Sequence, residues 1–153
     1  MDLESEKIAA TQPGYVGFWK RVVASFIDTV VVIIVTVPLL FAVYGRAYFS
    51  RDGTEPFAGL TDVLIQLVLP PLFAILFWKF RGATPGKMLV AARIVDARTL
   101  GEPSSGQLIG RYFAYLLSAL PLGLGFLWVA FDKRKQGWHD KLAKTLVIED
   151  DEA

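Results

Sequence analysis

The stretch GFWKRVVASFIDTVVVIIVTVPLLFAVY, residues 17–44, decides the fold of this chain. Between residues 22 and 43 the only charged side chain is Asp28, and so long an apolar run is typical of a helix that crosses a bilayer. At a rise of about 1.5 Å per residue, the run reaches roughly 33 Å. We therefore predict a first membrane-spanning helix over residues 19–44.

Asp28 lies inside this predicted helix, on the same face as Arg21 and Ser25. An acidic side chain at that depth costs about 2.5–3.5 kcal/mol on insertion scales, so it normally faces protein or trapped water. Asp28 either joins helices through a hydrogen bond or forms part of a polar site with Arg21. Because the two residues are about 10 Å apart along the helix axis, a third group must complete their pairing.

Composition places the chain among membrane proteins and excludes several kinds of chemistry. The 153 residues are 54% hydrophobic and carry a net charge of +1, with basic residues scattered along the chain, so we expect one domain and no nucleic acid partner. The absence of cysteine excludes disulfides, thiolate metal sites and a cysteine nucleophile. His139, the only histidine, is more typical of a packing residue than of a metal ligand or base. We predict no enzyme activity, cofactor or metal.

The pass along the chain predicts a disordered cytoplasmic tail at residues 1–14, a membrane domain at 15–148 and an acidic tail at 149–153. A second span is predicted at residues 60–80. Its Pro70-Pro71 pair predicts a break or sharp bend near Leu69. Gln66, inside this span, is predicted to hydrogen-bond to a neighbouring helix.

A basic segment follows the second span. Its Pro85-Gly86 pair suits a type II turn, which would bring Lys87 to lipid phosphates. Residues 89–95 form a short β-prone piece that could pair with the β-prone residues 145–148 near the end of the chain.

The third apolar stretch, residues 107–131, carries a small-residue face of Gly110, Ala114 and Ser118 and is interrupted at Pro121. It either crosses the bilayer once or turns back as a hairpin or re-entrant pair. Because cytoplasmic loops are enriched in Lys and Arg, the amino terminus, the middle loop and the tail should share the cytoplasmic face, which favours the hairpin. The predicted fold class is an all-α membrane protein with two transmembrane helices, a hairpin or re-entrant third segment and a small cytoplasmic β-pairing.

Three separate stretches carry a family resemblance: FWKR at 18–21 with Asp28 after it, TPGK at 84–87 followed by RIVD at 93–96, and WHD at 138–140 followed by TLV at 145–147. In order and spacing they resemble the RDD family of small bacterial integral membrane proteins, named for one arginine and two aspartates. The resemblance matches Arg21 and Asp28 to the arginine and the first aspartate. The second aspartate would be Asp140 or, as the alternative, Asp96. It implies an inner-membrane location, with transport as the usual proposal for the family.

These residues predict a polar site in which Arg21 lies between Asp140 outside the membrane and Asp28 inside it, leaving Asp28 to exchange a proton or cation. The alternative is a structural clamp of Arg21 and Asp140 that docks the tail. The candidate supporting residues are Ser25, Gln66, Lys87, Arg111 and His139. The predicted function is an oligomeric transporter or ion exchanger in contact with the lipid bilayer, and the alternative is a non-transporting subunit that anchors a partner protein.

Overall fold

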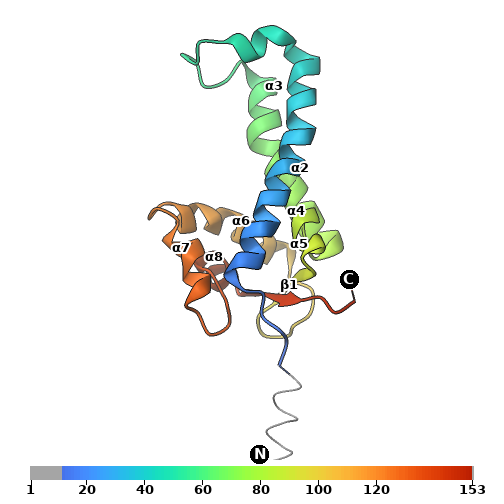
Figure 1. Ribbon diagram of the computed structural model, residues 1–153, viewed down its shortest axis with the longest axis vertical. Coiled ribbons are helices and arrows are strands. Elements are labelled where there is room, and N and C mark those ends of the chain that lie inside the picture. Colours follow the sequence, from blue (N-terminus) through green and yellow to red (C-terminus); the bar gives the residue numbers. More distant parts are fainter. Residues whose placement is uncertain (1–11, 153) are drawn as a thin grey trace, which may run out of the picture.

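The computed structural model describes residues 12–152, so most of the tail predicted at residues 1–14 lies outside the described residues, as does Ala153. Two long helical runs stand side by side and project from a smaller base (Figure 1). The first run is α2 (Phe18–Tyr44), and the second comprises α3 (Leu60–Val63), η2 (Leu64–Val68) and α4 (Leu69–Arg81). The loop between them, which includes η1 (Arg46–Ser50), lies at the end away from the base.

Both runs are long and apolar enough to cross a membrane. The 27 residues of α2 have a mean hydropathy of 2.6, and the 22 residues from Leu60 to Arg81 have a mean hydropathy of 2.0. These two runs confirm the predicted spans at 19–44 and 60–80, each to within one residue. Helix α2 continues past Pro38, as membrane helices do when a proline is accommodated by its neighbours.

Of the break or sharp bend predicted near Leu69, the break is wrong, because the Pro70-Pro71 pair lies inside one continuous helical run from Leu60 to Arg81. Residues Leu64–Val68 form a π-helical stretch directly before the prolines, and the α-helix resumes at Leu69. The prolines therefore fall in the first turn of α4, where their missing N–H groups remove least from the hydrogen-bond pattern. The π-helical stretch therefore accommodates the two prolines without the break that we had predicted.

The third apolar stretch is sharply bent, which is compatible with the predicted hairpin or re-entrant pair. Helix α6 (Ser105–Ala119) is followed by α7 (Leu124–Leu127) and η3 (Trp128–Ala130), and the two halves are bent by 109°. Reciprocal bonds between Ser104 and Gln107 cap α6 at its start. The stretch lies beside the half of α2 nearest the base and does not reach the far loop (Figure 1). A bend of this size fits either a broken span or a re-entrant pair.

A two-stranded antiparallel sheet forms the base. Strand β1 (Ala92–Asp96) pairs with β2 (Thr145–Glu149), and Ile94 lies opposite Val147. The predicted β-pairing is confirmed, although β1 begins three residues later than expected because residues before it form helix α5 (Pro85–Leu89).

Helix α5 replaces the type II turn predicted at Pro85-Gly86, and that prediction is wrong. Pro85 begins the helix, and the φ of Gly86 is not positive, so this glycine is needed for space. A Cβ at Gly86 would clash with the backbone carbonyl of Ala24 and lie 2.9 Å from the Asp28 Cγ. The missing side chain lets α5 pack directly on α2.

The hydrophobic core joins both ends of the chain. Its buried members are Val16, Trp78, Ala92, Ile94, Leu108 and Val147. The Val16 N–H donates to the Val147 carbonyl at 3.0 Å, so the residues just before α2 extend the sheet. Helix α8 (Trp138–Ala143) then packs on α6. The segment before α2, the middle loop and the carboxyl-terminal region therefore share one end of the molecule.

Candidate functional site

A buried carboxylate, Asp140, lies between two arginines in the base. The Arg21 Nη1 of α2 donates to its Oδ2 at 2.5 Å, and the Arg111 Nη1 of α6 donates to its Oδ1. The Gly137 N–H donates to Oδ2 at 2.9 Å, and Arg111 also donates to the Thr145 hydroxyl at 2.7 Å. This Arg–Asp–Arg cluster ties α2, α6, α8 and β2 together.

The electrostatics of the cluster favour the charged carboxylate. Burial raises the pKa of Asp140, but the positive charges of Arg111 and Arg21 lower it more, so its pKa lies below the ordinary value of 3.8. Arg21 is held on all sides: its Nη2 donates to the Lys135 carbonyl at 2.5 Å and its Nε donates to the Val16 carbonyl at 3.2 Å. The predicted approach of Asp140 to Arg21 is therefore present in the structure.

Asp96, the alternative second aspartate, lies elsewhere. It closes the turn after β1 by accepting the N–H groups of Arg98 and Thr99 and the side-chain amide of Gln107. These donors lower the pKa of Asp96 to about 2. The structure brings Asp140 to Arg21 and leaves Asp96 in this turn.

Asp28 binds a different partner from the one predicted. Its Oδ2 accepts the Thr84 hydroxyl at 2.5 Å, and its Oδ1 accepts the Gly86 N–H at 2.7 Å. Within residues 12–152 no hydrogen bond or ion pair joins Asp28 to Arg21. Asp28 therefore fixes the start of α5 against α2, and the prediction that it holds Arg21 is wrong. Thr84 followed by Pro85 is a helix-start signal, but it does not by itself identify Thr84 and Gly86 as partners of Asp28.

His139 is a packing residue. Its ring contacts the rings of Tyr115 and Phe126, with centroids 4.7 and 5.2 Å away, and the backbone N–H of His139 donates to the Ser118 hydroxyl at 3.2 Å. Burial lowers its pKa to about 3, so the imidazole is neutral at physiological pH. Within residues 12–152 no group of three or more His, Asp or Glu side chains is placed to hold a metal ion.

The remaining predicted residues are divided between the two ends of the molecule. Gln66 lies at the far end, where its amide donates to Asp62 at 2.6 Å and to the Tyr48 hydroxyl at 2.9 Å, so it is not part of the site. Lys87 is only 8% exposed, so it does not project from the protein toward the bilayer surface as the predicted turn would have it, and its contact with lipid phosphates stays a prediction. Because Gly86 lets α5 approach α2, Lys87 is directed inward, with its Nζ 6.0 Å from the centre of the Trp78 ring.

A pocket of about 770 Å³ lies between α2, α4, α6 and α7, beside the Arg–Asp–Arg cluster. This volume falls within the range of roughly 300–1,000 Å³ that is common for small-molecule sites. We call its polar end the floor. The residues of the floor are Arg21, Ser25, Asp28, Trp78, Thr84, Lys87, Arg111 and His139. The sequence had indicated all of these except Trp78 and Thr84.

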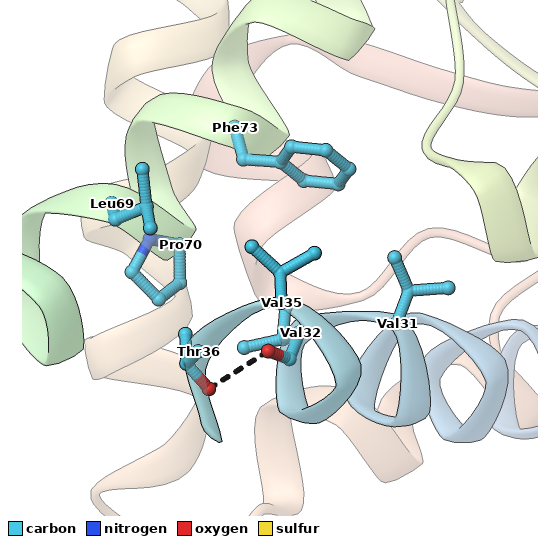
Figure 2. A pocket seen from close by; sticks show the side chains of 7 residues that line it. All are labelled: Val31, Val32, Val35, Thr36, Leu69, Pro70 and Phe73. Atoms are coloured by element: carbon cyan, nitrogen blue, oxygen red, sulfur yellow. Dashed lines mark hydrogen bonds between the residues drawn. The ribbon is translucent and has the colours of Figure 1, made fainter. Parts of the chain in front are cut away.

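A second, smaller cavity adjoins the apolar end of the pocket. It holds about 50 Å³ and shares Val32 and Pro70 with the larger pocket. Figure 2 shows Val32 and Val35 of α2 facing Pro70 and Phe73 of α4 across it. The Thr36 hydroxyl donates to the Val32 carbonyl at 2.8 Å, so the single polar side chain lining this cavity is already hydrogen-bonded within its own helix (Figure 2).

The fold and site define a helical membrane protein in which a re-entrant pair and a small sheet close over a buried Arg–Asp–Arg cluster. The chain belongs to the RDD family, whose pattern matches residues 15–144. It is similar to the Uncharacterized protein YxaI of Bacillus subtilis (strain 168), at 34% identity over 86% of this chain and 95% of that protein. It is also similar to the Uncharacterized protein RP437 of Rickettsia prowazekii (strain Madrid E), at 42% identity over 50% of this chain and 42% of that protein. No solved structure matches the chain.

Proposed function

We propose that this RDD family protein is an oligomeric membrane transporter that binds its solute in the pocket between α2, α4 and α6. The observation that carries the proposal is the floor of this pocket, where charged side chains line a ligand-sized space beside the two membrane-spanning helices. Ionisable residues at membrane depth are costly and mark substrate paths by default.

The geometry favours a solute site in the pocket over ion exchange at Asp28. Each carboxylate oxygen of Asp28 already accepts a hydrogen bond, from Thr84 and from Gly86. Arg21 is likewise engaged by Asp140 and by two backbone carbonyls. The polar groups of Asp28 and Arg21 are therefore used to hold the floor of the pocket in place. Lys87, by contrast, lines the pocket without a hydrogen bond or ion pair to any residue between 12 and 152.

The proposed oligomer follows from the small number of spans. Two spans and a re-entrant pair enclose a pocket that remains open on one side, and a transport path needs more protein around it. The outer surface of α2 is apolar and exposed, as the exposed fractions of Phe26 (70%) and Ile34 (65%) show. Such a surface suits either lipid or a second copy. The mass of the purified protein in nanodiscs measures the copy number, and a monomer would contradict this part of the proposal.

We further propose that the end bearing the sheet faces the cytoplasm of a bacterial inner membrane. The support is the positive-inside pattern, together with the pairing of β1 and β2 that places the middle loop and the tail at one end. The chain has no cysteine, so single cysteines at Ser50, Arg98 and Glu152 can be labelled in intact cells with an impermeant reagent. We expect only the Ser50 variant to react. Labelling of the other two and not of Ser50 would reverse the orientation.

The transport proposal is tested without assuming a solute. Vesicles containing the protein are incubated with a total small-molecule extract of bacterial cells, washed, and analysed by mass spectrometry. We expect at least one compound to accumulate relative to protein-free vesicles. Accumulation should be lost in Ala119→Trp, because Ala119 is exposed and lines the pocket, so the larger ring blocks the space without disturbing the core. Contents that match those of protein-free vesicles would refute transport.

The alternative function is a non-transporting subunit that anchors a partner protein. One observation favours it: Gly110 on α6 is exposed and has no other group within 4 Å of its Cβ position, so a partner helix could approach there. A partner that co-purifies with the wild type and is lost in Gly110→Leu would support the alternative. A homogeneous, partner-free preparation would count against it.

A further inference from the structure

The floor of the pocket contains hydrogen-bond donors that lack acceptors. Among the residues described, Arg111 Nε, Arg111 Nη2 and Trp78 Nε1 are buried without a hydrogen-bond partner. Both side chains line the pocket, and Arg111 is fully buried. Lys87 is a second cationic side chain with free donors, because between residues 12 and 152 it makes no hydrogen bond or ion pair. Leaving buried donors without acceptors is unfavourable, so this arrangement suits a ligand rich in acceptors.

The charges at the floor also favour a ligand that carries acceptor groups. The floor carries three cations, Arg21, Lys87 and Arg111, and one carboxylate, Asp28. Asp140 lies behind the floor, paired with Arg21 and Arg111, so the group as a whole has one positive charge in excess. Both carboxylates are already bonded on each oxygen. Burial is the main reason that the pKa of His139 is lowered; Asp140 raises this pKa, and Arg111, Arg21 and Lys87 each lower it. A negative charge is the missing partner.

The rest of the pocket is mostly apolar, with Thr29, Tyr112 and Tyr115 as its polar residues, and it extends along α2. Its walls rise from the floor along α2 and α4 through Val22, Val32, Ile33, Pro70 and Ala74, and continue into the small cavity of Figure 2. From Arg21 to Val35 the rise along α2 is about 21 Å. A small inorganic anion would satisfy the floor and leave these walls empty.

We propose that the pocket binds an anionic amphiphile, with a carboxylate or phosphate headgroup at Lys87, Arg111 and Trp78 and an apolar chain lying between α2 and α4. This proposal rests on the transport function proposed above and names its substrate class. Binding of the amphiphile does not itself require transport. The headgroup supplies the acceptors that the floor lacks, and the chain lies along the apolar side chains of α2 and α4. The membrane is the reservoir from which such a ligand partitions.

Binding is measured on the full chain in nanodiscs of neutral phosphatidylcholine, as saturable binding of radiolabelled oleate. The competitors are unlabelled oleate, a lysophosphatidate with the same acyl chain, methyl oleate and inorganic phosphate. We expect oleate and the lysophosphatidate to compete, and whichever binds more tightly identifies the headgroup. Methyl oleate, which has the chain without the charge, should compete at least tenfold more weakly. Equal competition by methyl oleate would overturn the charged headgroup, and equal competition by phosphate would overturn the apolar chain.

Substitutions then locate the site. Lys87→Gln should weaken oleate binding at least tenfold, and Lys87→Arg should retain it, because the positive charge is kept. Lys133→Gln removes an exposed lysine outside the pocket and should leave binding unchanged. Since Lys87 makes no hydrogen bond or ion pair with residues 12–152, its removal leaves the fold intact, which circular dichroism verifies. Wild-type affinity in Lys87→Gln would overturn the assignment.

The two proposals fail separately. Specific oleate binding without solute accumulation in vesicles refutes transport and leaves the amphiphile site standing. Accumulation of a neutral or cationic compound that oleate does not displace refutes the amphiphile site and leaves transport standing.

Discussion

Replacing Asp140 by Asn should destabilise the protein severely. The substitution keeps the shape of the side chain and an oxygen for the Gly137 N–H, but removes the charge that compensates Arg21 and Arg111. Asp140 is fully buried, and the Arg21 side chain is only 10% exposed, so little solvent replaces the lost partner. Removing one partner of a buried ion pair costs about 3–5 kcal/mol. At about 2–4 °C per kcal/mol for a chain of this size, we expect the Tm to fall by roughly 6–20 °C.

The assay is thermal unfolding in one detergent, followed by the fluorescence of the four tryptophans. The matched control is Glu149→Gln, because the Lys20–Glu149 pair has the same 2.5 Å separation but side chains that are 50% and 44% exposed. An exposed pair contributes at most about 1 kcal/mol. If Asp140→Asn lowers the Tm no more than Glu149→Gln does, the inference that the Arg–Asp–Arg cluster holds the base together is refuted.

Three further predictions follow from the same geometry. The pKa of His139 is lowered from 6.5 to about 3, so between these pH values the unfolded state binds a proton that the folded state does not. Stability should therefore fall as the pH drops below 6.5. In His139→Phe the slope of Tm against pH should flatten, and an unchanged slope would contradict the lowered pKa of His139. Below pH 3.8 the wild type should lose the contribution of ionised Asp140, whereas Asp140→Asn should show no such loss in an acid titration. Gly86→Ala should lower the free energy of unfolding by about 1–3 kcal/mol, because the added Cβ would clash with the Ala24 carbonyl. Gly110→Ala, where the added Cβ meets open space, should be neutral or stabilising by up to about 1 kcal/mol. Equal effects of the two substitutions in thermal unfolding would argue against close packing of α5 on α2.

Local signals in the sequence were sufficient to predict the two membrane-spanning helices. The apolar runs identified both membrane-spanning helices, and the basic residues indicated that the third stretch turns back, which in turn allowed Asp140 to approach Arg21. The β-pairing was predictable because both segments are β-prone and were placed at one end.

Other features depended on contacts that no local pattern reveals. A proline followed by glycine suits a turn as well as a helix start, and only the approach of α2 decides between them at Pro85-Gly86. The partners of Asp28 were missed for this reason. Arg111 was placed among the supporting residues, although its spacing of three from Leu108 and Ala114 puts it on the buried face of α6. The π-helical stretch before Pro70 has no sequence signal that we recognise.

The separation of Arg21 from its carboxylate has a consequence for biosynthesis. The two residues are 119 positions apart, so the partner emerges from the ribosome roughly 6–24 s after Arg21 at about 5–20 residues per second. During that interval α2 is already made, while its arginine still lacks the countercharge. A chain truncated before Asp140 would never supply it, and would leave two arginines at the membrane surface as a mark of incomplete assembly that a protease or chaperone could recognise.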